Sequence, residues 1–238
     1  MPERTFVKYT FIRVDPTWRR RDPLERAQDK REFAAACNDF AEDHYLRAYS
    51  LVGLRGDCDL LVRAATPNLD AIHELHVILN QSGLMRWSQI PHSYLAVTKE
   101  SVYADEPQPL APRATDHRFL IVYPMWKKRE WYGLGDDERM RIMRDHIAVA
   151  RRHTGISTNT AYSFGLDDQE FVVAFDVDDP KEFLDLVQEL RSTESSAYTE
   201  SETPIFTCIS ASVERALDAL DGEVLRSQSS VLKGVTQS

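Results

Sequence analysis

His146 is the side chain with the clearest potential for chemistry, because it occurs in only one copy of an internal repeat. Three matched positions lie 113 residues apart: Arg26 and Arg139, Phe33 and His146, Tyr49 and Tyr162. A repeat of this length indicates two copies of one domain-sized unit rather than a solenoid. One copy has a phenylalanine where the other has a histidine, which indicates that one copy gained a site or the other lost it.

The surroundings of His146 leave two interpretations open. The pattern predicts a helix over 136–152, and Met143 and Ile147 place His146 on or beside its apolar stripe. A histidine there can be a core residue with satisfied hydrogen bonds, or a ligand to a metal or a heme iron. A single imidazole without neighbouring ligands cannot complete a zinc site. It can be the only protein ligand of a heme iron, because the porphyrin supplies four nitrogens.

The elements that position His146 follow one order twice, strand-helix-strand-strand-helix-strand, which is the ferredoxin-like α+β arrangement. The first set is expected at 5–14, 23–43, 45–54, 58–65, 67–82 and 92–98, and the second at 118–125, 136–152, 157–164, 169–177, 180–191 and 205–211. We therefore predict a first repeat at 1–103, a Pro-rich linker at 104–116, a second repeat at 117–220 and a flexible tail at 221–238.

Composition narrows the functional class. A net charge of −9 argues against nonspecific binding to nucleic acid or to an anionic membrane. No apolar stretch approaches the ~18 residues that a membrane span needs. The start of the chain has no signal-peptide pattern, and the three cysteines, Cys37, Cys58 and Cys208, are widely spaced, as in reduced, buried thiols. These features predict a cytoplasmic protein.

Four segments in order resemble the chlorite dismutase family, which includes the coproheme decarboxylases of bacterial heme synthesis. The segments are YPMWKKREWY at 123–132, MRDHI at 143–147, YSFGLDDQEFVVAF at 162–175 and LRSTESSAYT at 190–199. The resemblance extends over about residues 5–211. It implies a dimeric α+β barrel of two ferredoxin-like repeats, assembly as a homo-oligomer, usually a pentamer, and heme b or coproheme bound by the second repeat.

The resemblance also implies roles for individual residues. His146 matches the axial ligand of the heme iron, and Glu194 matches the carboxylate that accepts the imidazole N–H. Tyr123 matches the tyrosine that becomes a radical in the decarboxylases, and Lys127 matches a lysine beside a propionate. Four further positions match residues around the porphyrin and its propionates: Met125, Trp131, Arg191 and Ser196.

The residues themselves allow simpler interpretations. Tyr123 and Met125 alternate on a strand and can be ordinary packing residues. Lys127 lies in a basic run of the kind that is usually solvated. Arg191 and Glu194 are spaced i,i+3 and can pair with each other.

The chain departs from the family on the side of the heme where the oxidant binds. Chlorite dismutases have an arginine seven residues before the glycine of the YS-x-G motif, and here that position is Thr158. One decarboxylase branch instead uses a histidine about 17 residues before the tyrosine, where this chain has Glu106. A neutral side chain cannot hold an oxyanion as an arginine does.

We therefore expect oxidation of coproheme propionates driven by hydrogen peroxide. Chlorite dismutation, a weak peroxidase, or a heme carrier or sensor without turnover are the alternatives.

Overall fold

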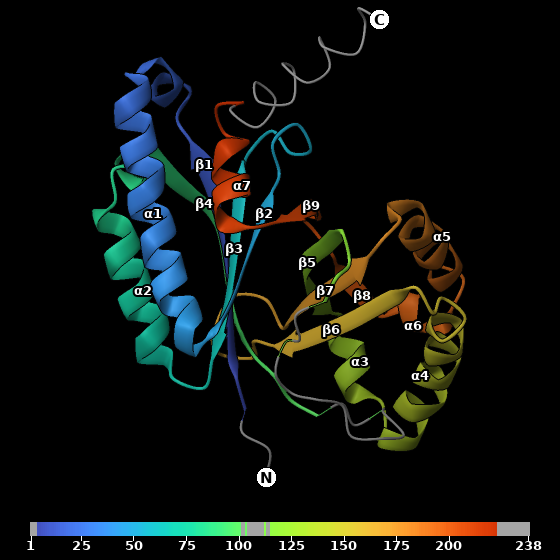
Figure 1. The fold of residues 1–238 in the computed structure, drawn as a ribbon. Helices are drawn as coiled ribbons and strands as arrows, with labels where there is room; N and C mark the ends of the chain where they lie inside the picture. Colours follow the sequence, from blue (N-terminus) through green and yellow to red (C-terminus); the bar gives the residue numbers. More distant parts are fainter. Residues whose placement is uncertain (1–3, 101–102, 104–111, 113–114, 223–238) are drawn as a thin grey trace, which may run out of the picture. The chain divides into compact units, whose positions relative to one another are not determined.

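The first repeat has the expected order of elements (Figure 1). The structure is a computed structural model that describes residues 4–100, 103, 112 and 115–222. The elements are β1 (Phe6–Val14), η1 (Pro16–Arg20), α1 (Pro23–Asp43), β2 (Tyr45–Ser50), β3 (Leu60–Thr66), α2 (Leu69–Gln81), η2 (Leu84–Trp87) and β4 (Ser88–Val97).

The second repeat follows the same order, and it also has short helices in the same two places. Its elements are β5 (Phe119–Lys127), α3 (Arg129–Gly133), α4 (Asp136–Ala150), β6 (Ile156–Tyr162), β7 (Phe171–Val177), α5 (Pro180–Leu190), α6 (Glu194–Ala197), β8 (Thr199–Ser201) and β9 (Phe206–Ala211). A last helix, α7 (Val213–Asp218), follows. The predicted linker at 104–116 and tail at 221–238 lie mostly outside the described residues, as does Glu106.

The strand order confirms the ferredoxin-like fold of each repeat. The described strands form one nine-stranded sheet, in which the first repeat has the order β4-β1-β3-β2. In the second repeat, β8 and β9 both pair with β5, in the position that β4 takes beside β1, and β7 and β6 follow on the other side of β5. The hairpins β2–β3 and β6–β7 are both antiparallel. Because the two orders are the same, an element in one repeat has a direct counterpart in the other. How the strands of the two repeats combine into the barrel that the resemblance implies stays a prediction.

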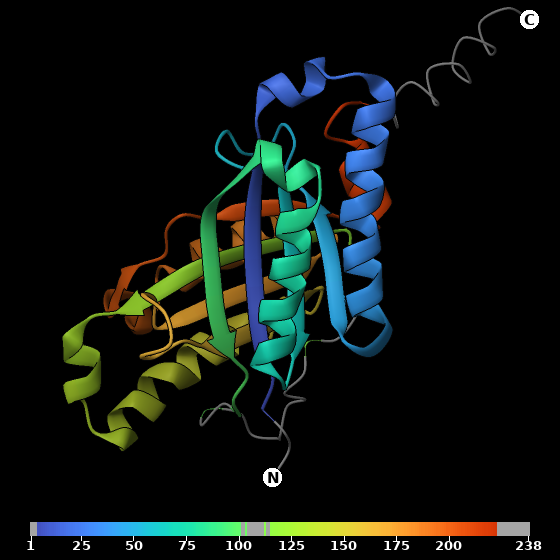
Figure 2. The same cartoon turned by 90° about the vertical axis from the view of Figure 1, so that its left-hand side faces the viewer.

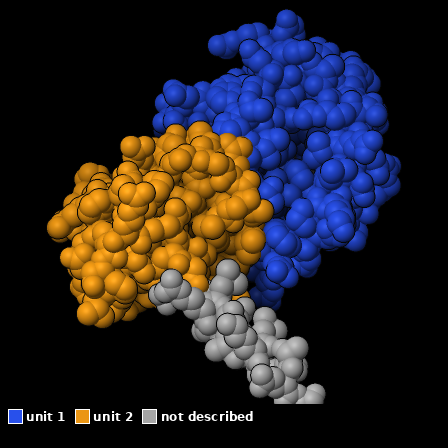
Figure 3. All heavy atoms as spheres, turned by 90° about the horizontal axis from the view of Figure 1, so that it is seen from above, with its two compact units in different colours: residues 1–7, 94–207 blue, residues 8–93, 208–238 orange. Residues whose placement is uncertain are grey.

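The chain forms two compact units, which Figure 3 shows in different colours. One unit comprises residues 1–7 and 94–207, and the other comprises 8–93 and 208–238. In the second of these, α1 and α2 lie side by side over one face of the sheet (Figure 2). Its core joins Phe33 and Cys37 of α1 to Ala216 and Leu217 of α7. Helix α7 therefore packs on the first repeat, although it follows the second in sequence.

Local sequence explains where the site helices begin. The Asp179 side chain accepts a hydrogen bond from the Lys181 N–H, and Pro180 is the first residue of α5, a combination typical of helix N-termini. Helix α4 has no side-chain cap, but its first turn contains Asp136, Asp137 and Glu138, whose charges favour the positive end of the helix dipole.

The cysteines Cys37, Cys58 and Cys208 are all buried free thiols, as expected. Among the described residues, no helix is both long and apolar enough to cross a membrane.

Candidate functional site

One face of the second repeat's sheet carries the predicted site residues. Paired residues on adjacent strands point to the same face, so Tyr123 on β5 and Val173 on β7 share a face. That face packs against Val149 and Ala150 of α4 and Phe183 and other apolar residues of α5. Figure 1 shows α4, α5 and α6 gathered beside β6 and β7. Helix α4, which carries His146, and strand β5, which carries Tyr123, therefore belong to one apolar cluster.

His146 has a nitrogen that lacks a partner. Its Nδ1 atom is buried, and among the described residues no group hydrogen-bonds to it. Burial, together with the nearby charge of Lys127, lowers the pKa of His146 to about 4. The imidazole is therefore neutral at pH 7, which is the form that binds a metal.

An unsatisfied buried nitrogen is unusual for a histidine that serves only the core. It is what an iron ligand would show when the acceptor for its other nitrogen is turned away.

Glu194, the expected acceptor, hydrogen-bonds elsewhere. Both of its carboxylate oxygens accept from Nη2 of Arg141, at 3.0 and 2.8 Å. Arg141 also donates to both oxygens of Glu138. The alternative pairing of Glu194 with Arg191 does not form, because the Arg191 guanidinium pairs with Glu202. The role of Glu194 toward His146 thus stays a prediction.

Comparison of the repeats supports placing Glu194 near His146. Helix α6 begins at Glu194, and its counterpart η2 begins at Leu84. Phe33, the counterpart of His146, and Leu84 are both 0% exposed and belong to the same hydrophobic cluster. The two positions are thus filled by packed apolar side chains in one repeat and by an imidazole and a carboxylate in the other. This difference explains why only the second repeat is a candidate site.

Lys127 is half-buried rather than solvated. Its Nζ donates to the Thr199 hydroxyl at 3.2 Å and to the Ser195 carbonyl at 3.4 Å, and it lies 5.1 Å from the centroid of the Trp131 ring. Burial lowers the pKa of Lys127 to about 8, although the charges of Glu202 and Glu170 oppose that shift. A cation with mainly neutral partners is ready to bind an anion.

Tyr123 is 7% exposed, and its ring stacks on Phe175 with centroids 5.9 Å apart. Burial raises the pKa of the phenol, and the charge of Glu202 adds to the effect while Arg191 opposes it. The phenol is therefore protonated at neutral pH. Met125, two residues after Tyr123, lies on the same face of the sheet and packs against the same apolar cluster.

Thr158 lies on the face that also carries Tyr123. On β6 it pairs with Phe175, whose other neighbour is Ile121 on β5. Its side chain is exposed. Asn159 points to the opposite face, where its Nδ2 donates to Asp176 at 3.1 Å. The register therefore places Thr158, and not Asn159, on the side of the sheet that faces the helices.

The remaining predicted residues lie on α3, at the end of α5 and on α6. Trp131 is buried, and its ring lies 5.5 Å from that of Tyr198. Ser196 on α6 is half-buried, and Arg191 is the C-cap of α5. Sequence reasoning missed Ser195, Thr199 and Glu202, whose only sequence signal was their position within or just after LRSTESSAYT.

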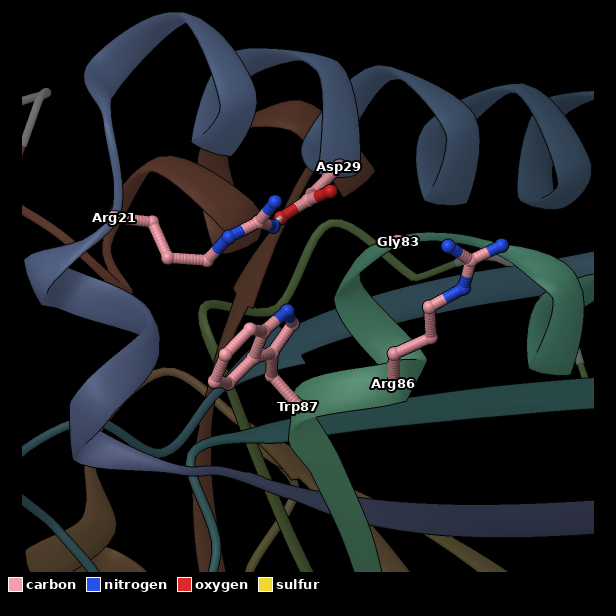
Figure 4. A pocket seen from close by; sticks show the side chains of 5 residues that line it. All are labelled: Arg21, Asp29, Gly83, Arg86 and Trp87. Atoms are coloured by element: carbon pink, nitrogen blue, oxygen red, sulfur yellow. Dashed lines mark hydrogen bonds and ion pairs between the residues drawn. The ribbon is translucent and has the colours of Figure 1, made fainter.

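A pocket of about 280 Å³ in the other unit is not the candidate site (Figure 4). Arg21 reaches toward Asp29 and forms an ion pair with it, and the Arg21 guanidinium lies 5.2 Å from the ring of Trp87. Asp29 also accepts from Nε1 of Trp18 at 2.8 Å. A Cβ at position 83 would meet Oδ1 of Asp29 at 1.9 Å, so any larger residue there requires the Asp29 side chain to shift. The principal charges of this pocket already bind each other.

Comparisons with known proteins show the family of the chain. A sequence model described as chlorite dismutase matches residues 26–211. A coproheme decarboxylase from Mycolicibacterium smegmatis is 29% identical over 174 residues, which are 72% of this chain and 75% of the relative.

Two solved structures share the fold. One is the chlorite dismutase of Candidatus Nitrospira defluvii in complex with imidazole, with a TM-score of 0.84, 19% identity and coverage of 91% of this chain and 95% of that one. The other is a variant of the same enzyme in complex with cyanide, with a TM-score of 0.84, 18% identity and the same coverage. The matched region spans most of both repeats, and the chain belongs to the chlorite dismutase family.

Proposed function

We propose that this protein is a heme-dependent oxidoreductase that oxidatively decarboxylates coproheme with hydrogen peroxide. The observation that carries the proposal is that a buried phenol lies close to two cations, Lys127 with mainly neutral partners and Arg191 paired with Glu202. Tyr123 lies within the electrostatic influence of Arg191, and Lys127 lies on the same strand with mainly neutral partners. The relative from M. smegmatis, named for this reaction, supports the assignment.

Each residue has a role in this proposal. His146 holds the iron, Lys127 with Arg191 and Ser196 binds propionates, and Met125 and Trp131 pack against the porphyrin. The bound iron porphyrin supplies the oxidising power that peroxide delivers. For each propionate, loss of carbon dioxide would leave a vinyl group and release two electrons, which reduce one hydrogen peroxide to two water molecules through the bound porphyrin. Tyr123 would give up its phenolic hydrogen and then take one hydrogen atom from the adjacent propionate, and the second electron would leave as the carbon–carboxylate bond breaks. Glu194 orients His146 once Arg141 releases it.

The neutral residue at position 158 is the reason to prefer decarboxylation over chlorite dismutation. Thr158 has no charge to hold an oxyanion, whereas Tyr123, Lys127, Arg191 and Ser196 are all present. A heme carrier or sensor of the same fold is the non-catalytic alternative. We further propose a cytoplasmic homo-oligomer, a pentamer by family resemblance, whose chain has repeats at 1–103 and 117–220, a linker at 104–116 and a tail at 221–238.

Incubation of the full chain with coproheme and hydrogen peroxide, followed by mass spectrometry of the porphyrin, tests the proposal. Loss of two carboxyl groups is the expected product. Oxygen release from chlorite without decarboxylation would favour the dismutase, and binding without either turnover would favour the carrier.

The register of β6 gives a prediction about oxidant cleavage. Thr158→Arg should raise chlorite turnover by about 10²-fold, the scale of one well-placed donor. Asn159→Arg should not, because Asn159 points to the opposite face. Oxygen release from chlorite measures the effect in variants with an unchanged Soret band. An equal response of the two variants would contradict the assignment of faces.

The lowered pKa of Lys127 gives a prediction about binding. The ammonium is charged below pH 8 and neutral above it, so coproheme affinity should fall as pH rises through about 8. Lys127→Met should bind about tenfold more weakly at pH 7, the scale of one lost charge-assisted contact, and should lack the decline. Titrations of apoprotein followed by absorbance check this. A decline of the same size in Lys127→Met would assign it to another group.

A further inference from the structure

We propose that Glu202 is an internal counter-ion of Arg191 that gives way to the reacting carboxylate of the porphyrin and thereby sets selectivity between porphyrins. This inference rests on the proposed function, because it assumes that a propionate lies beside Tyr123. It assigns a specificity role to a residue that the sequence analysis did not single out.

The position of Glu202 follows from the short strand β8. Ser201, the last residue of β8, pairs with Trp126 of β5, and Glu202 comes directly after it. The Glu202 side chain is 19% exposed, whereas that of its partner Arg191 is 52% exposed. The carboxylate is thus the more buried member of the pair. The pair joins the end of α5 to the end of β8, beside the strand that carries Tyr123.

The charge of Glu202 reaches the other members of the site. It raises the pKa of Tyr123 and opposes the lowering of the pKa of Lys127. Glu202 thus pairs directly with the guanidinium and is close enough to affect the titration of the phenol and of the ammonium. These three groups are the ones that the proposed function assigns to a reacting propionate.

A carboxylate in a site for a polycarboxylate needs an explanation, because like charges repel at short range. Glu202 and Arg191 neutralise each other when no ligand is present, so the more buried carboxylate is not left unpaired. An entering propionate must displace Glu202, which weakens binding. When that propionate has lost its carboxyl group, Glu202 can pair with Arg191 again. The exchange of Glu202 for a propionate at Arg191 therefore lowers the affinity for the substrate and favours release of the decarboxylated product.

Selectivity between coproheme and heme b follows from whether the porphyrin has a carboxylate beside Arg191 and Glu202. Coproheme has four propionates, and heme b has vinyl groups where two of them were. If Glu202 faces a reacting propionate, removal of its charge helps coproheme and leaves heme b nearly unaffected. A carboxylate that acted only on stability would change both affinities alike.

Binding titrations of full-length apoprotein with coproheme and with heme b provide the test. Glu202→Gln should bind coproheme about tenfold more tightly than the wild type, with less than a threefold change for heme b, as expected from removal of one like charge. Glu200→Gln is the matched control, because Glu200 is an exposed acid on β8 that forms no ion pair among the described residues. It should change neither affinity.

A double variant tests whether Glu202 acts through Arg191. In an Arg191→Gln background, Glu202→Gln should gain clearly less coproheme affinity than in the wild type. Equal gains for both porphyrins, or no gain for coproheme, would overturn the inference.

A wild type that binds neither porphyrin would overturn the proposed function and this inference together. Normal binding through His146 with no selectivity change in Glu202→Gln would overturn this inference alone.

Discussion

Replacing His146 with alanine is expected to shift and weaken the Soret band relative to the reconstituted wild type and to weaken porphyrin binding by on the order of 100-fold. The imidazole is neutral at pH 7 because burial lowers its pKa, so its lone pair is available to iron. The cofactor's four ring nitrogens leave the axial position to the protein. Absorbance titrations with heme b and coproheme measure both effects.

His73→Ala is the matched control, because His73 is an exposed histidine on α2, on a helix of the first repeat. It should leave the Soret band unchanged. Addition of imidazole to His146→Ala should restore the band, since free imidazole can occupy the space of the deleted ring. An unaltered spectrum in His146→Ala, with a fold that matches the wild type by circular dichroism, would show that another residue binds the iron.

The long elements could be predicted because the spacing of their apolar residues agreed with the residue types found where they begin. Strands β1 and β5 and helices α1 and α4 were found within a few residues of their observed limits. The short helices η1, η2, α3 and α6 were not predicted, because elements of four or five residues are too short to show a period. Strand β8, with three residues, was missed for the same reason. Three of these missed elements, α3, α6 and β8, lie in the candidate site.

Side-chain pairing could not be predicted from spacing. Arg191 and Glu194 are suitably spaced to pair, yet Arg191 binds Glu202 and Glu194 binds Arg141. Each choice depends on where α4, α6 and β8 meet, which is tertiary information. Lys127 shows the same limit, because its basic neighbours suggested solvent whereas its strand position places it under Trp131. The family resemblance predicted the site residues, and the structure shows which of them already pair with other side chains.

Replacing Tyr123 with phenylalanine should reduce decarboxylation of coproheme by about 10³-fold or more, the scale expected when a reacting group is lost. Burial raises the pKa of the phenol, and Glu202 strengthens that effect, so its hydrogen is present at neutral pH. The ring itself packs on Phe175, and phenylalanine retains that contact. Coproheme affinity should therefore change less than about threefold, since the hydroxyl is the only group lost.

Tyr198→Phe separates a reacting phenol from a nearby one. Tyr198 lies against Trp131, and the substitution removes the same kind of hydroxyl while Tyr123 is unchanged. Mass spectrometry should show near-normal decarboxylation in this variant and unreacted coproheme in Tyr123→Phe. Substantial product from Tyr123→Phe would mean that hydrogen abstraction occurs elsewhere. If Tyr123 alone takes hydrogen from the propionate, decarboxylation should depend on its hydroxyl and not on that of Tyr198. An equal loss of activity in both variants would instead show that the two phenols act in a relay.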